Sequence, residues 1–158
     1  MPVNENDFND PEKYINDESI ELAWAIKAAE RANIHINLLM GCDTKSLKLN
    51  RHQPDIDKAF REAFPDMNVR MVGETELKSG DMKEKWRVFC ELFKESIDDY
   101  SMGTLMRIEA QKAYSDANTI IVPKIIFLAV EGARNTEGIN EDLKQCYTLD
   151  HQLNTAPL

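Results

Sequence analysis

The most apolar segment of the chain, residues 123–136, carries a line of polar side chains. If the segment is a helix, Lys124, Glu131, Arg134 and Asn135 fall within one arc of about 100°. A buried charge is costly unless it is paired. We therefore expect Glu131 and Arg134, three residues apart, to form an ion pair that ties the helix to a neighbouring hairpin. The alternative is that this polar side lines a groove that contacts a partner.

The other residues that could do chemistry are isolated in the sequence. His35 falls on the apolar side of a predicted helix and Cys90 lies in an apolar stripe, so both are interpreted as core residues. Asp98 and Asp99 stand beside Tyr100, where two carboxylates could exchange protons or simply be solvated. No Cys or His pair has zinc spacing, and no phosphate-binding loop, nucleophile elbow or dinucleotide fingerprint is present. We expect no catalytic residue, no cofactor and no metal ion.

The charge balance excludes two classes of partner. The chain has 158 residues, with 19 Lys and Arg against 28 Asp and Glu, which gives a net charge of −9. A nucleic-acid binder needs a basic face to neutralise phosphates, and an anionic membrane surface attracts basic proteins. We therefore expect neither nucleic acid nor membrane as a direct partner. An acidic surface suits a basic protein partner.

The cysteines and the first residues favour a cytoplasmic location. Cys42, Cys90 and Cys146 are an odd number at wide spacing, which is typical of reduced thiols. Residues 1–17 have neither a cationic start nor an apolar core, so no secretory or mitochondrial signal is expected. No apolar run reaches the roughly 18 residues that a membrane-spanning helix needs.

The elements that position these residues are mostly helical. Helices are expected at 17–41, 54–64 and 81–100, where apolar residues recur at intervals of three and four. Residues 1–16 are acidic and rich in Asn, so we expect them to be disordered. The helix at 81–100 has the narrowest apolar stripe, made of Met82, Trp86, Phe89, Cys90, Phe93, Ile97 and Tyr100.

A β-hairpin is expected after Tyr100. Residues 104–108 and 118–122 are short runs rich in Thr, Ile, Val and Leu, separated by a polar loop. Pro123 suits the first turn of the helix that follows, at 123–136, and this helix should be central because it is apolar nearly all round. The sequence thus predicts one α+β domain, mostly helical, with a small antiparallel hairpin packed on a central helix. The domain should span residues 17–140, and 141–158 should be a polar tail with a short helix near 142–146.

Five short segments, in order along the chain, carry a resemblance to a known family. These are Glu21 to Ala25, Lys83 to Arg87, Asp99 to Arg107, Tyr114 to Thr119, and Phe127 to Asn135 with Gly138 and Asn140. Together they resemble the small eukaryotic family named "polysaccharide biosynthesis domain-containing", over about residues 18–140. Gly132 departs from the family pattern, in which Ile is expected. Glycine inside a helix costs about 1 kcal/mol relative to Ala unless close packing repays it.

The resemblance implies a dedicated, non-enzymatic chaperone of translation elongation factor 1-alpha. Such a protein would bind the nascent GTP-binding domain in the cytoplasm and release it once that domain has folded around its nucleotide. The family name itself suggests a different class, an enzyme of polysaccharide biosynthesis. A general protein-interaction adaptor is the third alternative.

We expect the client to contact the hairpin and the residues around it. Tyr and Arg anchor protein interfaces well because each offers a large contact area with a polar group. The family motifs are also concentrated in this region. Tyr114 and Asn118 have an alternative role, in which they only hold the loop. The candidate partner-binding residues are Arg87, Tyr100, Gly103, Thr104, Arg107, Tyr114, Asn118, Glu131, Arg134 and Asn135.

Overall fold

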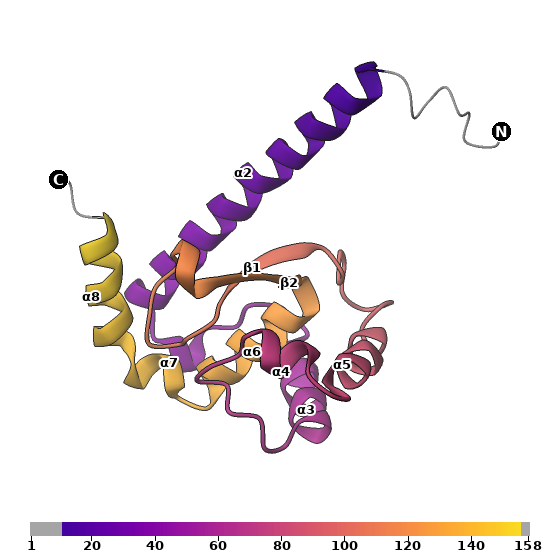
Figure 1. Ribbon diagram of the computed structural model, residues 1–158. Coiled ribbons are helices and arrows are strands. Elements are labelled where there is room, and N and C mark those ends of the chain that lie inside the picture. Colours follow the sequence, from indigo (N-terminus) through magenta and orange to yellow (C-terminus); the bar gives the residue numbers. More distant parts are fainter. Residues whose placement is uncertain (1–10, 156–158) are drawn as a thin grey trace.

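A computed structural model describes the backbone of residues 11–155 and the side chains of residues 18–155. The first element is a long helix, α2 (Pro11–Gly41), whose N-terminal half extends beyond the rest of the molecule (Figure 1). It begins at Pro11 rather than at residue 17, so the prediction of disorder is wrong for residues 11–16. The rest of the segment predicted to be disordered, residues 1–10, lies outside the described residues.

Two of the three following helices match predicted ones. The chain continues through a short 3-10 turn, η1 (Thr44–Ser46), into α3 (Gln53–Ala63), which has Pro54 in its first turn as expected. A short helix, α4 (Glu74–Lys78), was not predicted, and α5 (Met82–Glu91) follows it. The expected helix at 81–100 therefore ends at Glu91, near its middle.

The apolar stripe of α5 nevertheless continues past the end of the helix. Phe93 and Ile97 are buried, although they lie in turns. The backbone N–H groups of Leu92, Phe93 and Lys94 bond to carbonyls three residues back, not four. Tight turns of this kind keep apolar side chains on one side, as a helix does. The spacing predicted the burial correctly but not the type of backbone.

The hairpin and the central helix are confirmed. Strand β1 (Gly103–Arg107) pairs antiparallel with β2 (Thr119–Pro123), with Gly103 opposite Pro123 and Arg107 opposite Thr119. A 3-10 turn, η2 (Asp116–Asn118), precedes β2. Helix α6 (Lys124–Thr136) follows β2 directly and has ten buried residues. The α+β class, with one small hairpin packed on a central helix, is thus as the sequence predicts.

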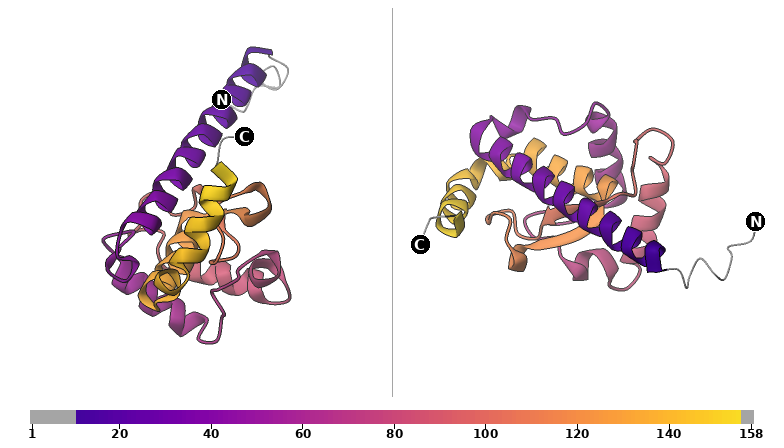
Figure 2. Two further views of the ribbon diagram at one scale, coloured as in Figure 1. Left: turned by 90° about the vertical axis from the view of Figure 1, so that its left-hand side faces the viewer. Right: turned by 90° about the horizontal axis from the view of Figure 1, so that it is seen from above.

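A different helix covers each face of the hairpin. Helix α2 crosses the hairpin on one side, as the view from above shows (Figure 2), and α6 packs against the other. The main core lies between α3, α5 and α6, where the rings of Phe60 and Phe64 stack on Trp86 and Phe89 packs edge-on against it. As predicted, Trp86, Phe89 and Phe93 are buried and Trp24 is partly buried.

The last residues are not a tail. Helices α7 (Ile139–Asp142) and α8 (Lys144–Thr155) follow Gly138, whose φ of 81° is a left-handed conformation that glycine adopts without strain. Tyr147 of α8 is fully buried in a second cluster with Ile36, Leu39 and Ala113. The prediction of a polar tail with only a short helix near 142–146 is therefore wrong. Packing of one tyrosine fixes α8 beside the C-terminal end of α2 (Figure 1).

Gly132 is explained by a close approach between helices. A Cβ atom at this position would overlap with the amide nitrogen Nε2 of Gln53. That nitrogen donates to the carbonyl of Leu128 at 2.8 Å and to Asp57 Oδ1 at 2.8 Å. Glycine therefore lets the side chain of α3 reach the backbone of α6, and this contact repays the helix propensity that glycine forfeits.

Candidate partner-binding site

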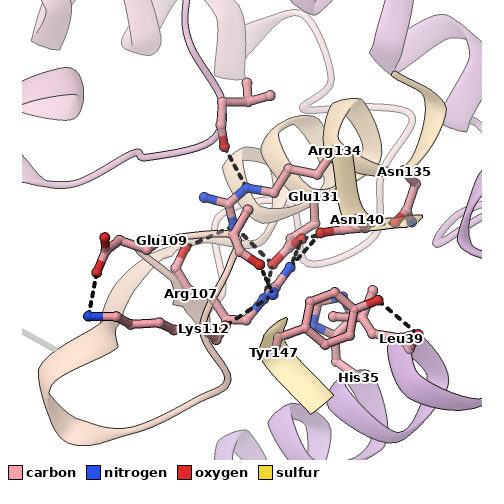
Figure 3. Close-up of polar contacts among 12 residues, drawn as sticks. His35, Leu39, Arg107, Glu109, Lys112, Glu131, Arg134, Asn135, Asn140 and Tyr147 are labelled. Atoms are coloured by element: carbon pink, nitrogen blue, oxygen red, sulfur yellow. Dashed lines mark hydrogen bonds and ion pairs between the residues drawn. The ribbon is translucent and has the colours of Figure 1, made fainter. Parts of the chain in front are cut away.

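The candidate site is built around a buried guanidinium at the end of β1. Arg107 is fully buried and donates to both carboxylate oxygens of Glu131, from Nε at 3.0 Å and from Nη2 at 2.9 Å (Figure 3). Its remaining donors reach the carbonyls of Ala110 and Lys112, at 2.8 and 3.1 Å, and Oδ1 of Asn140 at 2.8 Å. Every N–H group of this side chain thus faces an acceptor from the loop, α6 or α7.

A second buried guanidinium completes the network. Arg134 Nη1 lies 3.1 Å from Glu131 Oε2, which confirms the predicted ion pair. The same guanidinium donates to the carbonyls of Val69, Arg107 and Ile108, at 2.7, 2.9 and 2.8 Å. It therefore ties the central helix to the hairpin, as expected, and also to the segment before α4.

The three charged groups remain ionised at neutral pH. Burial alone would raise the pKa of Glu131, but Arg107 and Arg134 lower it more and hold it far below its usual range. Burial lowers the pKa of Arg134 to about 10, against the opposing effect of Glu131. For Arg107, the Glu131 carboxylate outweighs burial and raises the pKa. Two positive charges and one negative charge are thus enclosed in the core.

Asparagines extend the network on both sides. Asn118 accepts from the N–H of Glu109 at 2.8 Å and donates to the carbonyls of Glu109 and Ala113, at 3.1 and 3.0 Å. Asn135 donates to the carbonyl of Leu47 and accepts from Asn140, at 3.3 and 2.7 Å. These contacts hold the loop between the strands and the connector after α2. The interpretation of Asn118 as a residue that holds the loop fits this geometry.

Half of the candidate partner-binding residues are therefore not on the surface. Their side chains are buried because each uses its polar groups on other parts of the chain. This corrects the expectation that they contact a client directly. It also restricts to Lys124 the alternative in which the polar side of α6 lines a groove, because Glu131, Arg134 and Asn135 are buried. The buried five are Arg107, Asn118, Glu131, Arg134 and Asn135.

The other candidate residues lie beside two separate hollows. Thr104 and Tyr114 line a hollow of about 300 Å³ between α2, β1 and α6. Arg87 and Tyr100 line a groove of about 400 Å³ between α5 and β2. Gly103 lies between them, where Trp24 of α2 donates from Nε1 to its carbonyl at 3.1 Å. A Cβ at Gly103 would stand 3.2 Å from the Trp24 ring, so the small residue permits this contact.

The first hollow contains a buried histidine. His35 Nδ1 lies 2.7 Å from the hydroxyl of Tyr114, and its ring packs edge-on against Phe127. Burial lowers the pKa of His35 to about 4, so the imidazole is neutral at physiological pH. The prediction of a core histidine is confirmed. Its second nitrogen, Nε2, is buried without a hydrogen-bond partner among residues 18–155.

The groove beside α5 has an exposed pair of charges at its edge. Arg87 donates to Glu84 from Nε at 2.9 Å and from Nη2 at 2.5 Å, and both side chains are well exposed. Cys90 lines the groove wall, and burial raises the pKa of its thiol to about 11. The thiol is thus protonated at neutral pH, in line with its interpretation as a packing residue.

Sequence reasoning missed Asn140 and Tyr147, which complete the site around Arg107, and Lys144, which joins α8 to the segment after α2. Asn140 and Tyr147 contact Arg107, the latter with its ring 5.2 Å from the guanidinium carbon. Lys144 donates to the carbonyl of Cys42 and to Glu141. Only Asn140 gave a signal in the sequence, through its place in a family motif.

Within the described part of the chain, no cluster of three or more His, Cys, Asp or Glu could hold a metal ion. No helix of residues 11–155 is long and apolar enough to span a membrane.

The fold and the site define a small α+β domain whose hairpin is fixed by buried charges between a long helix and a central one. The model of the PBDC1 protein family matches residues 20–145, so the chain belongs to this family, as its motifs indicated. The chain is 44% identical over 131 residues to Protein PBDC1 of Mus musculus, covering 83% of this chain and 66% of that protein. The human protein is 40% identical over 82% of this chain and 56% of its own length. The matched region thus spans about two thirds or less of the length of each of these mammalian relatives.

Two fungal relatives match over nearly their whole length. The PBDC1 homologue of Schizosaccharomyces pombe is 36% identical over 86% of this chain and 95% of that protein. A solution NMR structure of a Saccharomyces cerevisiae protein has a TM-score of 0.72 and 35% identity, and covers 81% of this chain and 90% of that one. The fold described above is therefore shared with an experimentally determined structure.

Proposed function

We propose that this protein is a cytoplasmic, non-enzymatic chaperone that binds the GTP-binding domain of nascent translation elongation factor 1-alpha. The family membership and the net charge of −9 support the proposal, because elongation factor 1-alpha is basic. The observation that carries it is the construction of the hairpin. Buried ion pairs hold the hairpin rigidly, and an apolar hollow opens beside each strand.

This arrangement suits binding of a polypeptide. A rigid scaffold lowers the entropy lost on association, because few side chains of the chaperone need to be ordered. Tyr100 and Tyr114 line the two hollows and offer aromatic area with a polar group, the composition typical of interface anchors. Client contact would then involve the half-exposed candidates Tyr100, Thr104 and Tyr114 with the exposed Arg87, while the buried five keep the hairpin in place.

The decisive experiment compares nascent and folded clients. Ribosomes stalled after the GTP-binding domain of elongation factor 1-alpha are incubated with the protein, and so is the purified factor with bound nucleotide. We expect capture of the first and not of the second. Equal capture of both would contradict a chaperone that releases its folded client. As a control, Lys58→Ala changes an exposed residue of α3 and should leave capture unchanged.

A second measurement addresses enzymatic activity. The protein is incubated with nucleotide sugars and with methyl donors, and consumption of each is followed. We expect no turnover beyond that of buffer. Turnover that scales with protein concentration would favour the enzyme suggested by the family name.

A further inference from the structure

The two outer edges of the hairpin differ in how the outward backbone groups are hydrogen-bonded. In an antiparallel pair, alternate residues direct their N–H and C=O groups toward the partner strand and away from it. Ile108 donates to the carbonyl of Asn118 at 2.9 Å, in continuation of the strand register. The outward groups of β1 are therefore those of Gly103, Leu105 and Arg107. The outward groups of β2 are those of Thr119 and Ile121.

The outward carbonyls of β1 are all bonded by side chains. The carbonyl of Gly103 accepts from Trp24 Nε1 at 3.1 Å, and that of Leu105 accepts from the Tyr114 hydroxyl at 3.3 Å. The carbonyl of Arg107 accepts from Arg134 Nη1 at 2.9 Å. Three different elements thus satisfy all three outward carbonyls of this strand. The family motifs that contain these donors are explained in part by this role.

The outer edge of β2 is open. Within residues 18–155, no hydrogen bond joins the outward N–H or C=O groups of Thr119 or Ile121 to another part of the chain. The Ile121 side chain is 58% exposed. An exposed strand edge with free donors and acceptors is a template for one more strand. Native proteins usually protect such edges from pairing with other chains. The open edge of β2, beside a strand whose outward carbonyls are all bonded, therefore indicates a place for a partner.

The surroundings of the open edge are shaped for an extended chain. The groove between α5 and β2 lies on one side of Ile121, and a hollow of about 440 Å³, lined by Ala29, Asn33 and Thr119, lies on its other side. An extended segment directs successive side chains to opposite faces. A strand added to β2 would therefore place one side chain in the groove and the next toward α2.

The groove also selects by charge. Its walls include Trp86, Val122 and Ile126, which suit an apolar side chain. Three cations, Lys78, Lys83 and Arg87, lie along it, against one carboxylate, Glu91. Lys78 and Arg87 share their charges with Glu74 and Glu84, while Lys83 forms no ion pair within the described residues. On a chain with a net charge of −9, this local excess of cations favours an acidic residue in the partner segment.

We propose that the free edge of β2 pairs with an extended segment of the client, which places an apolar side chain in the α5 groove and a carboxylate near Lys83. The inference rests on the proposed function, in which the client is a nascent domain. A nascent domain exposes strand segments before the rest of its sheet has been made. Pairing with β2 satisfies the backbone of such a segment, and completion of the client's own sheet then withdraws it.

The test removes one outward donor. Ile121→Pro deletes the N–H group that faces away from β1 and leaves every bond of the hairpin ladder in place, and proline is tolerated on edge strands. Ile121→Val is the matched control, because it keeps the N–H group and most of the side chain. We expect Ile121→Pro to lower capture of ribosome-bound GTP-binding domain at least tenfold and Ile121→Val to lower it less than twofold. Thermal melts of the free proteins establish that both are folded.

A measurement on the unaltered protein complements the variants. Amide hydrogen exchange of Thr119 and Ile121 is followed by NMR in the full chain, alone and with nucleotide-free GTP-binding domain of elongation factor 1-alpha. We expect both amides to exchange at least tenfold more slowly in the complex. Replacing Lys83 and Arg87 together with Glu should weaken the same complex, whereas the same change at Lys58 should not.

The outcomes separate the inference from the proposed function. If wild type and Ile121→Pro capture the nascent domain equally, or if the two amides exchange at the same rate in the complex, the inference is overturned and the chaperone function stands. Protection that rises with the concentration of this chain alone would place a second copy on the edge and also overturn it. If wild type captures no nascent domain, the proposed function fails and the inference fails with it.

Discussion

Arg107 of β1 and Glu131 of α6 form a two-point ion pair in which both side chains are fully buried. Arg134 joins the same carboxylate from within α6, so one negative charge serves two positive ones. Because the two guanidiniums also donate to five backbone carbonyls, the cluster joins the hairpin, its loop, the central helix and the segment before α4. The geometry of the hairpin thus depends on one carboxylate.

This dependence predicts an order of stability among variants. Glu131→Gln leaves two guanidiniums buried without their counter-charge, and we expect the free energy of unfolding to fall by about 3–5 kcal/mol. Arg107→Met should cost less, because Glu131 remains paired with Arg134. The double variant should lose less than the sum of the two single losses. Urea titrations measure all three, with Glu84→Gln as a control in an exposed ion pair. Additive losses would mean that the two residues do not interact.

The buried histidine predicts a pH dependence. The folded protein keeps His35 neutral down to a pKa of about 4, whereas the unfolded chain takes up the proton near the usual value of 6.5. The unfolded state therefore binds more protons between these two values, and the free energy of unfolding falls as the pH is lowered from 6.5. The slope has an upper bound of about 1.4 kcal/mol per pH unit.

His35→Gln tests this assignment because glutamine does not titrate. Urea titrations between pH 5 and pH 7 should give a positive slope for wild type and a flatter one for the variant. The window stops at pH 5 because the contribution of Glu131, whose folded pKa is also depressed, is fully present above its unfolded pKa of 4.5. An equal slope in the two proteins would show that another group accounts for the pH dependence.

The sequence predicted the central helix and its internal ion pair because both follow from local spacing. The apolar residues of 123–136 repeat around a helix, and Glu131 and Arg134 are neighbours on it. The burial of Arg107 could not be predicted in the same way. An arginine at the end of a short strand resembles an exposed residue, and the groups that enclose it, Asn140 and Tyr147, lie 33 and 40 positions further along the chain.

Two other errors have the same physical origin. Helix α8 has no strong apolar stripe, so the C-terminal region was interpreted as a tail, although a single tyrosine anchors it. The turns after α5 keep the apolar spacing of a helix, so the sequence could not show where α5 ends. In each case a contact between distant segments decides the structure, and periodicity reports only on near neighbours. The candidate residues do gather around the hairpin, but the sequence did not separate the buried ones from the exposed ones.

For Gly132→Ala we predict a loss of stability, although helix propensity alone would predict a gain. Alanine favours a helix by about 1 kcal/mol over glycine. The Cβ of Gly132→Ala would nevertheless overlap with Gln53, and we expect a net loss of about 1–3 kcal/mol in the free energy of unfolding. Gln53→Ser removes the end of the overlapping side chain, so Gly132→Ala should cost less in that background. Thermal melts of the four proteins form the cycle. A stabilising effect of Gly132→Ala in the wild-type background would contradict the close approach.

The last prediction concerns the anchoring of α8. Tyr147 is fully buried, its hydroxyl donates to the carbonyl of Leu39 at 3.0 Å, and its ring lies 5.2 Å from the Arg107 guanidinium carbon. Tyr147→Phe keeps the ring and removes one hydrogen bond, so it should cost about 1–2 kcal/mol. Tyr147→Leu also removes the aromatic face beside Arg107 and should cost more.

These two variants also separate docking of α8 from global stability. If Tyr147 holds α8 against the end of α2, amide exchange in α8 should accelerate more in Tyr147→Leu than exchange in α5, which lies on the opposite side of the molecule (Figure 1). Tyr147→Phe should accelerate exchange in α8 less than Tyr147→Leu does, because the ring still fills its site and only one hydrogen bond is lost. Cys146 is exposed and adjacent, so Cys146→Ser serves as a control that alters α8 without altering its contact. Equal acceleration in α8 and α5 would mean that Tyr147 supports the whole fold and does not specifically anchor α8.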